Sequence, residues 1–461
     1  MRRSAAALFV ALFALSQASI WAAYYAYGAK PLIGDERSYE DAALAILAGG
    51  AWMQSTIWPP LQPLLLAALH AAFGTGVLAA QLVQTALFVG CAALLRDLWR
   101  RLGGRVAAAN AAAALFLLNP GIAAYAHWLW PEIPHLFLLL AALDLLARSP
   151  TRARALAAGA CVGLAILAKS LLSPFWPAFL LVFVRRAPPR VLAGPALAFA
   201  LGLGAATLPP LVHGWRAYGT PMIADSSIYN LWIGLTDRWR SDYVEDMGGR
   251  TLPAFLASAP TPRERNALYL AKIRAFVAER GVARVLADQL GRQYFRLFGA
   301  KTPLVSQLPG RACAGHLSVY RTPPWLTRAL TAANDAFHAL TLGTAAFGLA
   351  ALPWFGAARR RAALAAPPPA RGDEAAAPLR IVVALFLAYQ LALFALVHVK
   401  ARFLLPMLPF LCGFAGDVLA ARGRGAPAAP AWPRFALGAA LAALLLFLAF
   451  GGPALDRLCT G

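Results

Sequence analysis

The chain of 461 residues is 60% hydrophobic and only 13% charged, with a formal net charge of +22 and a mean hydropathy of +0.61. Soluble domains carry about 25% charged residues, so this composition excludes an ordinary soluble enzyme and indicates an integral membrane protein. The positive charge does not indicate nucleic-acid binding, because the basic residues stand in short clusters between apolar runs.

The apolar runs predict an all-α polytopic membrane protein with about 11 transmembrane helices. Residues 5–27, after Arg2 and Arg3, are long enough to span and are interpreted as an uncleaved first helix with a cytoplasmic N-terminus. Arg-rich loops then alternate with sparsely charged ones, which is the positive-inside pattern. The expected cytoplasmic clusters lie at 96–105, 148–154, 185–190, 359–361 and 422–424. The C-terminus is then expected outside.

Three parts are expected along the chain. Residues 1–212 form an N-terminal transmembrane module whose first outer loop is 28–75, and residues 213–328 form a periplasmic helical region. Residues 329–461 form a C-terminal transmembrane module, in which the Pro/Ala-rich stretch 365–378 is expected to be a flexible cytoplasmic loop.

The first outer loop is the most polar stretch of the early chain, with four carboxylates within the seven residues 35–41. Asp35 is predicted to be a helix N-cap, because an apolar stripe with helical spacing begins at Tyr39. Gly49-Gly50 then predicts the end of this short amphipathic helix, and a second short helix is expected from Pro63 to about Gly74. The alternative is a solvated acidic turn after the first span.

The predicted outer face carries a small set of charged residues that suits group transfer from an anionic lipid. A carboxylate takes a proton from an acceptor, while cations hold a lipid phosphate leaving group. Each residue also has a structural alternative: Glu132 as a helix cap, Lys400 and Arg402 as headgroup anchors, and Lys169 as an ordinary interfacial lysine. The candidates are acidic Asp35, Glu36 and Glu132, and basic Lys169, His398, Lys400 and Arg402.

These segments resemble a known family. Gly34-Asp35-Glu36 with Tyr39, followed by Trp58-Pro59-Pro60 and Pro63, is similar to the first outer loop of the GT-C membrane glycosyltransferases. The branch it resembles is the bacterial family 39/83 group, related to protein O-mannosyltransferases and the aminoarabinose transferase of lipid A. Further matches follow in family order between about residues 30 and 410. They are Asn119-Pro120, Glu132-Ile133-Pro134, the run Gly163 to Lys169, the run Tyr229 to Gly234, and Arg402 with Pro406 and Pro409.

The resemblance implies a GT-C fold in a bacterial inner membrane, with the active site on the periplasmic face. It implies transfer of a sugar from a polyprenyl-phosphate donor, with inversion, to a lipid, glycan or protein acceptor. Asp35 is then the general base, and Glu36 and Glu132 support or orient the acceptor. Lys169, His398, Lys400 and Arg402 are candidates for the carrier phosphate, and Tyr39 and Asn230 are further substrate-binding candidates.

Three further expectations follow. Better-known relatives have a sizeable C-terminal outer domain, and no such domain is expected here. Its expected absence argues against a protein or lipid A acceptor. Some members of the family bind a divalent metal, but no convincing ligand set is visible in this sequence, and no nucleic-acid partner is expected. Among the five cysteines, Cys313 and Cys459 are both placed outside, where they either form a disulfide or remain two thiols.

The alternative function is a transporter or flippase of a lipid-linked sugar, in which the same charges line a path. An internal repeat would favour that alternative, and none is visible in the sequence. Asp144 and Arg148, spaced i, i+4 at a cytoplasmic helix end, are expected to be a structural pair.

Overall fold

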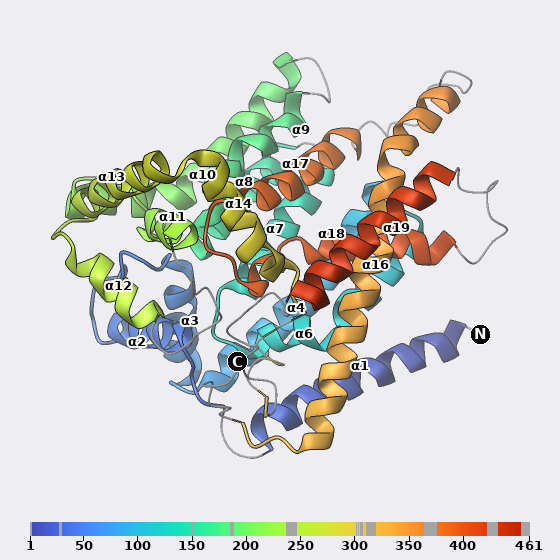
Figure 1. Ribbon diagram of the computed structural model, residues 1–461, viewed down its shortest axis with the longest axis horizontal. Coiled ribbons are helices and arrows are strands. Elements are labelled where there is room, and N and C mark those ends of the chain that lie inside the picture. The colour runs from blue at the N-terminus through green and yellow to red at the C-terminus, as the bar shows by residue number, and fades with distance from the viewer. Residues whose placement is uncertain are drawn as a thin grey trace.

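The computed structural model describes residues 2–26, 30–148, 151–184, 189–236, 247–300, 302, 304, 308–309, 320–363, 376–421 and 432–452. Over these residues the regular structure is entirely helical (Figure 1), as the sequence predicts. Five described helices are long and apolar enough to cross a membrane, and a sixth span results if one bent pair is counted. The five segments are Ala6–Tyr25, Val77–Arg101, Ala193–Tyr218, Ala377–Phe394 and Trp432–Gly451.

The first half of the chain alternates long helices with short ones that lie at their ends. Its elements are α1 (Arg2–Tyr25), α2 (Asp35–Leu47), α3 (Leu61–Phe73), α4 (Val77–Arg101), α5 (Val106–Leu118), α6 (Pro120–Ala123), η1 (Ala124–His127), α7 (Glu132–Ala147), α8 (Arg152–Ala168), η2 (Ser170–Leu180), α9 (Leu181–Val184) and α10 (Pro189–Tyr218).

The second half begins with a group of shorter helices and returns to long apolar ones. Its elements are α11 (Ser226–Thr236), α12 (Met247–Ala257), α13 (Pro262–Arg280), α14 (Val282–Arg292), η3 (Tyr294–Phe298), α16 (Pro324–Ala363), α17 (Ala376–Phe394), η4 (Ala401–Leu404), α18 (Leu408–Ala421), α19 (Trp432–Leu446) and η5 (Phe447–Gly451).

The eleven expected spans are not established by the structure. Several of them fall on helices of 11 to 17 residues, namely α5, α7, α8, η2 and α18. At 1.5 Å per residue, even 17 residues reach only about 26 Å, less than the roughly 30 Å of a bilayer's hydrocarbon core. Within the part of the chain that the structure describes, five or six segments qualify as spans by length and composition, which indicates a multi-pass membrane protein.

Small residues allow the membrane helices to approach closely. α8 packs between α7 and α10, while α18 packs against α5 and α16. Gly159 and Gly163, one turn apart on α8, face the backbone of α10, where an added Cβ would contact Phe199 and Leu203. This small-xxx-small pattern is the usual way for helices to pack in lipid, where no hydrophobic effect draws them together.

The chain bends sharply at Asn119-Pro120. Asn119 caps α6, because its side-chain oxygen accepts from the amides of Gly121 and Ile122 at 2.9 and 3.2 Å. Pro120 follows at the first helical position, where its missing N–H costs nothing. The axis turns by 61° between the segments Val106–Leu118 and Pro120–His127. The chain after the bend, residues 127–132, leads into the region of α2.

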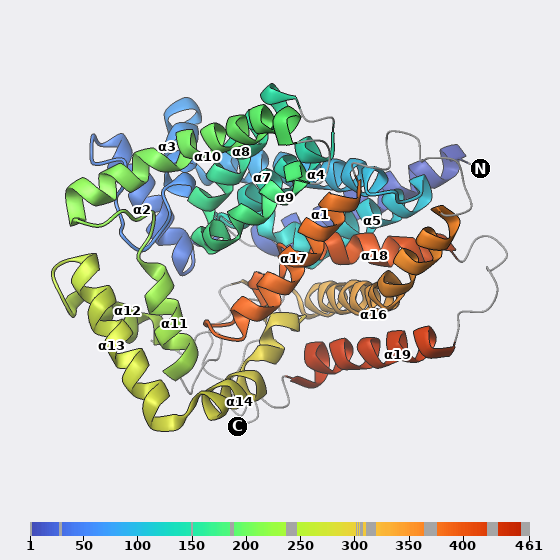
Figure 2. The same ribbon diagram turned by 90° about the horizontal axis from the view of Figure 1, so that it is seen from above.

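The helices α11–α13 lie at the end of the molecule away from the N-terminus, together with α2 and α3 (Figures 1 and 2). They hold the first outer loop through a second hydrophobic cluster of Ile57, Phe255 and Tyr269. A buried ion pair lies beside it, in which Arg265 Nη2 donates to Asp225 Oδ2 at 3.0 Å. Within the expected helical region 213–328, residues 262–298 form the helices α13, α14 and η3.

The two ends of α2 test the sequence predictions. α2 ends at Leu47, before Gly49 with a φ of 86°, as predicted from the paired glycines. The N-cap prediction is wrong: Gly34 is the N-cap, with a φ of 57° that glycine adopts without strain, and Asp35 is the first helical residue. Its carboxylate is therefore available for a contact outside the helix.

The expected pair of Asp144 and Arg148 is confirmed and belongs to a larger network. Arg148 Nη2 lies 2.7 Å from Asp144 and 2.9 Å from Asp97, and Arg101 joins both carboxylates, so α4 and α7 are linked. Cys91, Cys161 and Cys412 are free thiols. Cys313 and Cys459, the basic clusters at 185–186 and 422–424, the side chains of 359–361 and most of 365–378 lie outside the described residues.

Candidate active site

Four charged side chains from distant parts of the chain meet near the start of α2, and they are called here the outer charge cluster: Asp35, Glu132, Lys169 and Arg402. Arg402 Nη2 donates to Asp35 Oδ2 at 2.7 Å, a contact across 367 positions of sequence. Asp35 is displayed at the first residue of α2, where the helix dipole favours an anion. Arg402 lies in the short helix η4.

Glu132 joins the two cations of the cluster. Its Oε1 atom lies 2.9 Å from Lys169 Nζ and 3.7 Å from Arg402 Nε. Glu132 is the first residue of α7, and Lys169 is the residue at which α8 ends in an extended conformation before η2. Because Oε1 faces both cations, Glu132 links the start of α7 to the end of α8 and to η4, and its side chain makes no capping hydrogen bond in α7.

Three members of the cluster are accessible to a ligand. The side chains of Asp35, Arg402 and Lys169 are 17%, 15% and 13% exposed, whereas that of Glu132 is only 2% exposed. Arg402 lies over the ring of Trp130, at 4.6 Å from guanidinium carbon to ring centroid, and Lys169 lies 5.2 Å from the Phe403 ring. The charges therefore sit in a partly dry aromatic setting, where each interaction is stronger than in water.

The segment that carries Arg402 is fixed by contacts with α11 and α14. The amide of His398 donates to the carbonyl of Asn230 in α11 at 3.0 Å. Gln289 of α14 donates to the carbonyl of Val397 at 2.9 Å. An added Cβ at Gly234 would lie 2.5 Å from the His398 amide, so α11 approaches this segment too closely for any larger residue. Rigid docking of residues 397–400 sets the position of Arg402.

The electrostatics of Asp35 reflect a competition. Burial disfavours its charged form, but the Arg402 guanidinium, together with the charges of Lys400 and Lys169, holds the pKa of Asp35 below its ordinary value. Burial lowers the pKa of Lys169, against the effect of Glu132. The Asp35 carboxylate is thus ionised at neutral pH in the ligand-free protein.

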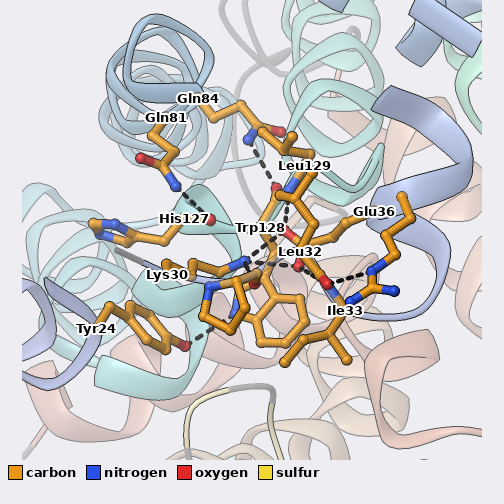
Figure 3. Close-up of polar contacts among 12 residues, drawn as sticks. Tyr24, Lys30, Leu32, Ile33, Glu36, Gln81, Gln84, His127, Trp128 and Leu129 are labelled. Atoms are coloured by element: carbon orange, nitrogen blue, oxygen red, sulfur yellow. Dashed lines mark hydrogen bonds and ion pairs between the residues drawn. The ribbon is translucent and has the colours of Figure 1, made fainter. Parts of the chain in front are cut away.

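Two of the predicted residues lie elsewhere. Glu36 points away from the outer charge cluster and is fully buried, with Lys30 Nζ at 2.7 Å from each of its oxygens (Figure 3). Asn230 turns its side chain back to the carbonyl of Ser226 at 2.7 Å, and only its backbone touches the site segment. Tyr39 is buried, with its ring 5.6 Å from that of Trp58.

Two residues of the region were missed in the sequence. Lys30 follows the first span by only a few residues and resembles an ordinary interfacial lysine, so nothing local marks it. Trp130 stands in an aromatic segment next to Glu132, and that proximity is a signal which could have been used. Among the described residues, no group of three or more His, Cys, Asp and Glu side chains could hold a metal ion.

No protein-family profile matches the chain, and a search of curated proteins gave no match. Solved structures give weak similarities. The archaeal oligosaccharyltransferase AglB from Archaeoglobus fulgidus, in complex with an inhibitory peptide and a dolichol-phosphate, is 13% identical with a TM-score of 0.45. The match covers 98% of this chain and 55% of that one, so this chain spans about half the length of the archaeal protein.

Structures of ArnT from Cupriavidus metallidurans are also similar. The apo form is 17% identical with a TM-score of 0.38, over 98% of this chain and 79% of that chain. The form bound to undecaprenyl phosphate is 17% identical with a TM-score of 0.37, over 86% and 77% of the two chains. Both identity and TM-score are too low to assign this chain to a family.

Proposed function

We propose that this chain is an inverting glycosyltransferase that moves a sugar from a polyprenyl-phosphate carrier to an acceptor on the periplasmic face of a bacterial inner membrane. The observation that carries the proposal is the outer charge cluster itself. Two carboxylates and two cations from four separate parts of the chain meet there, and three of the side chains are accessible.

The proposed reaction needs only a base and a site for phosphate. The acceptor oxygen attacks the anomeric carbon, and its proton goes to the Asp35 carboxylate. The bond between the anomeric carbon and the phosphate oxygen breaks, and its electron pair leaves with the polyprenyl phosphate. Because a phosphate is already a weak base, no separate general acid is required, and attack from the opposite side inverts the sugar.

The charges match such a donor. Lys169 and Arg402, with Lys400 acting on Asp35 through its charge, provide three cations against the two carboxylates of the cluster. The remaining positive charge corresponds to the single negative charge of a phosphodiester donor. A guanidinium offers two parallel donors to phosphate oxygens, so Arg402 is the leading phosphate ligand. His398 lies on the same fixed segment and is a further candidate.

Arg402 has two roles in this scheme, because its guanidinium is already engaged with Asp35 at 2.7 Å. A donor phosphate competes with Asp35 for the guanidinium. Once the phosphate binds the Arg402 guanidinium, Asp35 loses its counter-charge and becomes a better proton acceptor. Donor therefore binds before acceptor, and the base is activated only when a leaving group is in place.

The supporting residues are assigned by their contacts. Glu132 orients Lys169 and Arg402, Tyr39 supports the start of the site from α2, and Asn230 contributes through its backbone carbonyl. The proposal includes eleven spans with the N-terminus in the cytoplasm. The acceptor is a lipid, a glycan or a protein.

The test is sugar transfer by the purified full-length protein. Radiolabelled polyprenyl-phosphate sugars are incubated with the protein and a membrane extract, and the labelled product is identified. Asp35→Asn should lower single-turnover transfer by about 10²–10⁴-fold, because the amide cannot accept a proton. Asp41→Asn, an exposed residue on the same helix, is the matched control and should leave transfer unchanged.

Donor affinity separates this proposal from transport. Asp35→Asn should bind donor at least as tightly as the unmodified protein, since it frees Arg402. Movement of an intact lipid-linked sugar across proteoliposomes, with no transfer product and no effect of Asp35→Asn, would favour the flippase instead.

A further inference from the structure

A saturated buried ion pair lies directly behind the outer charge cluster. Lys30 Nζ contacts both oxygens of Glu36 at 2.7 Å, and the two side chains are 1% and 0% exposed. Two amides complete the set: Ile33 N donates to Oε2 at 3.0 Å and Leu129 N to Oε1 at 2.9 Å (Figure 3). Each carboxylate oxygen thus accepts two hydrogen bonds, and Glu36 has no lone pair directed at a substrate.

The partner segment of this pair is held from its other side. The carbonyls of residues 126–129 accept in turn from Gln84, Gln81, Gln84 again and Gln62, at 3.3, 3.1, 2.8 and 3.1 Å. All three glutamines are buried and come from α3 and α4. Since an unpaired buried carbonyl is costly, these bonds fix the segment in one conformation.

Lys30 also contacts the segment through a ring. Its ammonium lies 4.2 Å from the centroid of Trp128, whose indole N–H donates to the hydroxyl of Tyr24 at 3.0 Å. Figure 3 shows Lys30 between Glu36 and the Trp128 ring. One ammonium therefore joins α2, the end of α1 and the 126–129 segment.

The hydrogen bond from the Leu129 amide to Glu36 joins two backbone segments that carry members of the outer charge cluster. Glu36 follows Asp35, and Leu129 precedes Trp130, which lies under Arg402, by one residue. Glu132 comes two residues later. The bond from Leu129 to Glu36 spans 93 positions and links the backbone that carries Asp35 to the backbone that carries Glu132.

We propose that the Lys30–Glu36 pair is a positioning clamp that sets the distance between Asp35 and the Trp130–Glu132 end of the site. Lys30 is a positioning residue, not a catalytic one, since it acts through Glu36 and the Leu129 amide. The catalytic part of this inference rests on the proposed glycosyl transfer. The positional part does not.

The charge of Lys30 is essential to the clamp. A buried carboxylate without a cation tends to take up a proton, and burial already raises the pKa of Glu36 against the effect of Lys30. A protonated Glu36 turns one acceptor oxygen into a donor and loses one of its bonds to the amides. The 129–132 segment is then free to shift.

Two measurements test the clamp on the full-length protein in detergent. Hydrogen exchange of the peptide containing residues 126–131 should be at least 10-fold faster in Lys30→Met than in the unmodified protein. In transfer assays Lys30→Met should lower kcat by about 10²-fold, the usual cost of a misplacement near 1 Å. The donor KM should stay within 2-fold, and Lys30→Arg should restore most of kcat because the charge is kept.

Arg148→Met is the matched control, because it breaks an ion-pair network at α4 and α7 outside the cluster. It should lower thermal stability without changing kcat or exchange of 126–131. If Lys30→Met does not fold, Trp128→Phe takes its place. This substitution keeps an aromatic ring near Lys30 but removes the hydrogen bond to Tyr24. It should also accelerate exchange and lower kcat at constant KM.

Unchanged exchange together with unchanged kcat overturns the clamp. Faster exchange with unchanged kcat overturns the catalytic part of the proposal. A lower kcat together with a higher donor KM assigns Lys30 to general stability. If the unmodified protein transfers no sugar from any donor, the proposed function is wrong, and hydrogen exchange alone then decides the positional part.

Discussion

Arg402 contacts three groups: the carboxylates of Asp35 and Glu132 and the face of the Trp130 ring. We expect Arg402→Ala to weaken donor binding by about 10–100-fold, because a charge-assisted hydrogen bond contributes roughly 1.5–3 kcal/mol. Arg402→Lys should recover only part of this, since an ammonium lacks the planar fork.

Donor affinity measured by titration with a polyprenyl-phosphate sugar checks this prediction. Arg37→Ala is the control, since Arg37 is an exposed arginine of the same region that donates to the Leu32 carbonyl. Unchanged affinity in Arg402→Ala would reassign Arg402 to headgroup anchoring.

The pH dependence of transfer gives a second residue-level prediction. The pKa of Asp35 is lowered in the ligand-free protein, where the charges of Arg402, Lys400 and Lys169 outweigh burial. The value of kcat/KM should therefore stay constant well below neutral pH and fall only as the Asp35 carboxylate takes up a proton. In Arg402→Gln burial is no longer offset to the same extent, so the acid limb should move to higher pH. A limb that stays in place or moves to lower pH would show that Asp35 is not the titrating base.

Among the helices, the contact of α8 with α10 provides a matched pair of glycines. A Cβ at Gly202 would contact the carbonyl of Leu156 and lie 2.8 Å from the amide of Ala160, whereas a Cβ at Gly204 meets only Leu208 at 3.5 Å. Gly202→Ala should destabilise by about 1–3 kcal/mol through overpacking. Gly204→Ala should be neutral or stabilise by up to about 1 kcal/mol, because alanine favours helix. Thermal unfolding in detergent distinguishes them, and equal melting temperatures would contradict the close packing.

Helices and their ends were the most predictable part of this molecule. α2 ends at Leu47 and α3 at Phe73, in each case just before a glycine that the sequence predicts as the helix end, Gly49 and Gly74. The N-cap prediction for α2 was wrong because both Gly34 and Asp35 suit that position. The Asp35 carboxylate instead accepts from Arg402, which lies far away in sequence. The number of spans stays a prediction, because hydropathy does not show where an apolar run is broken, as at the 61° bend between Val106–Leu118 and Pro120–His127.

On the scale of the whole molecule, the orientation of the helices decides which face carries the outer charge cluster. The Arg clusters predict that reporter fusions at Arg101 and Arg154 signal cytoplasm, and that a fusion after Arg402 signals the opposite side. The clusters at 186, 360 and 424 extend the same test. An outer signal at two or more of the five Arg-rich loops would reject the eleven-span topology.

The alternation of basic and sparse loops grouped Asp35, Glu132, Lys169 and Arg402 on one face in the sequence, and the structure brings these four into contact. Their chemical roles stay predictions. Sequence could not separate Asp35 from Glu36, because the difference is a buried lysine and an amide 93 positions away. Nor could it show that Asn230 acts through its backbone.

The separation of 367 positions between Asp35 and Arg402 has a consequence for biosynthesis. At about 5–20 residues per second, a ribosome needs roughly 20–70 seconds to reach Arg402 after Asp35 has been made. During that time the Lys30–Glu36 pair, only six positions apart, can already form. On the proposed function, the half-inserted nascent chain has the Lys30–Glu36 pair but lacks Arg402 as a phosphate ligand, so we expect incomplete translation products to transfer no sugar.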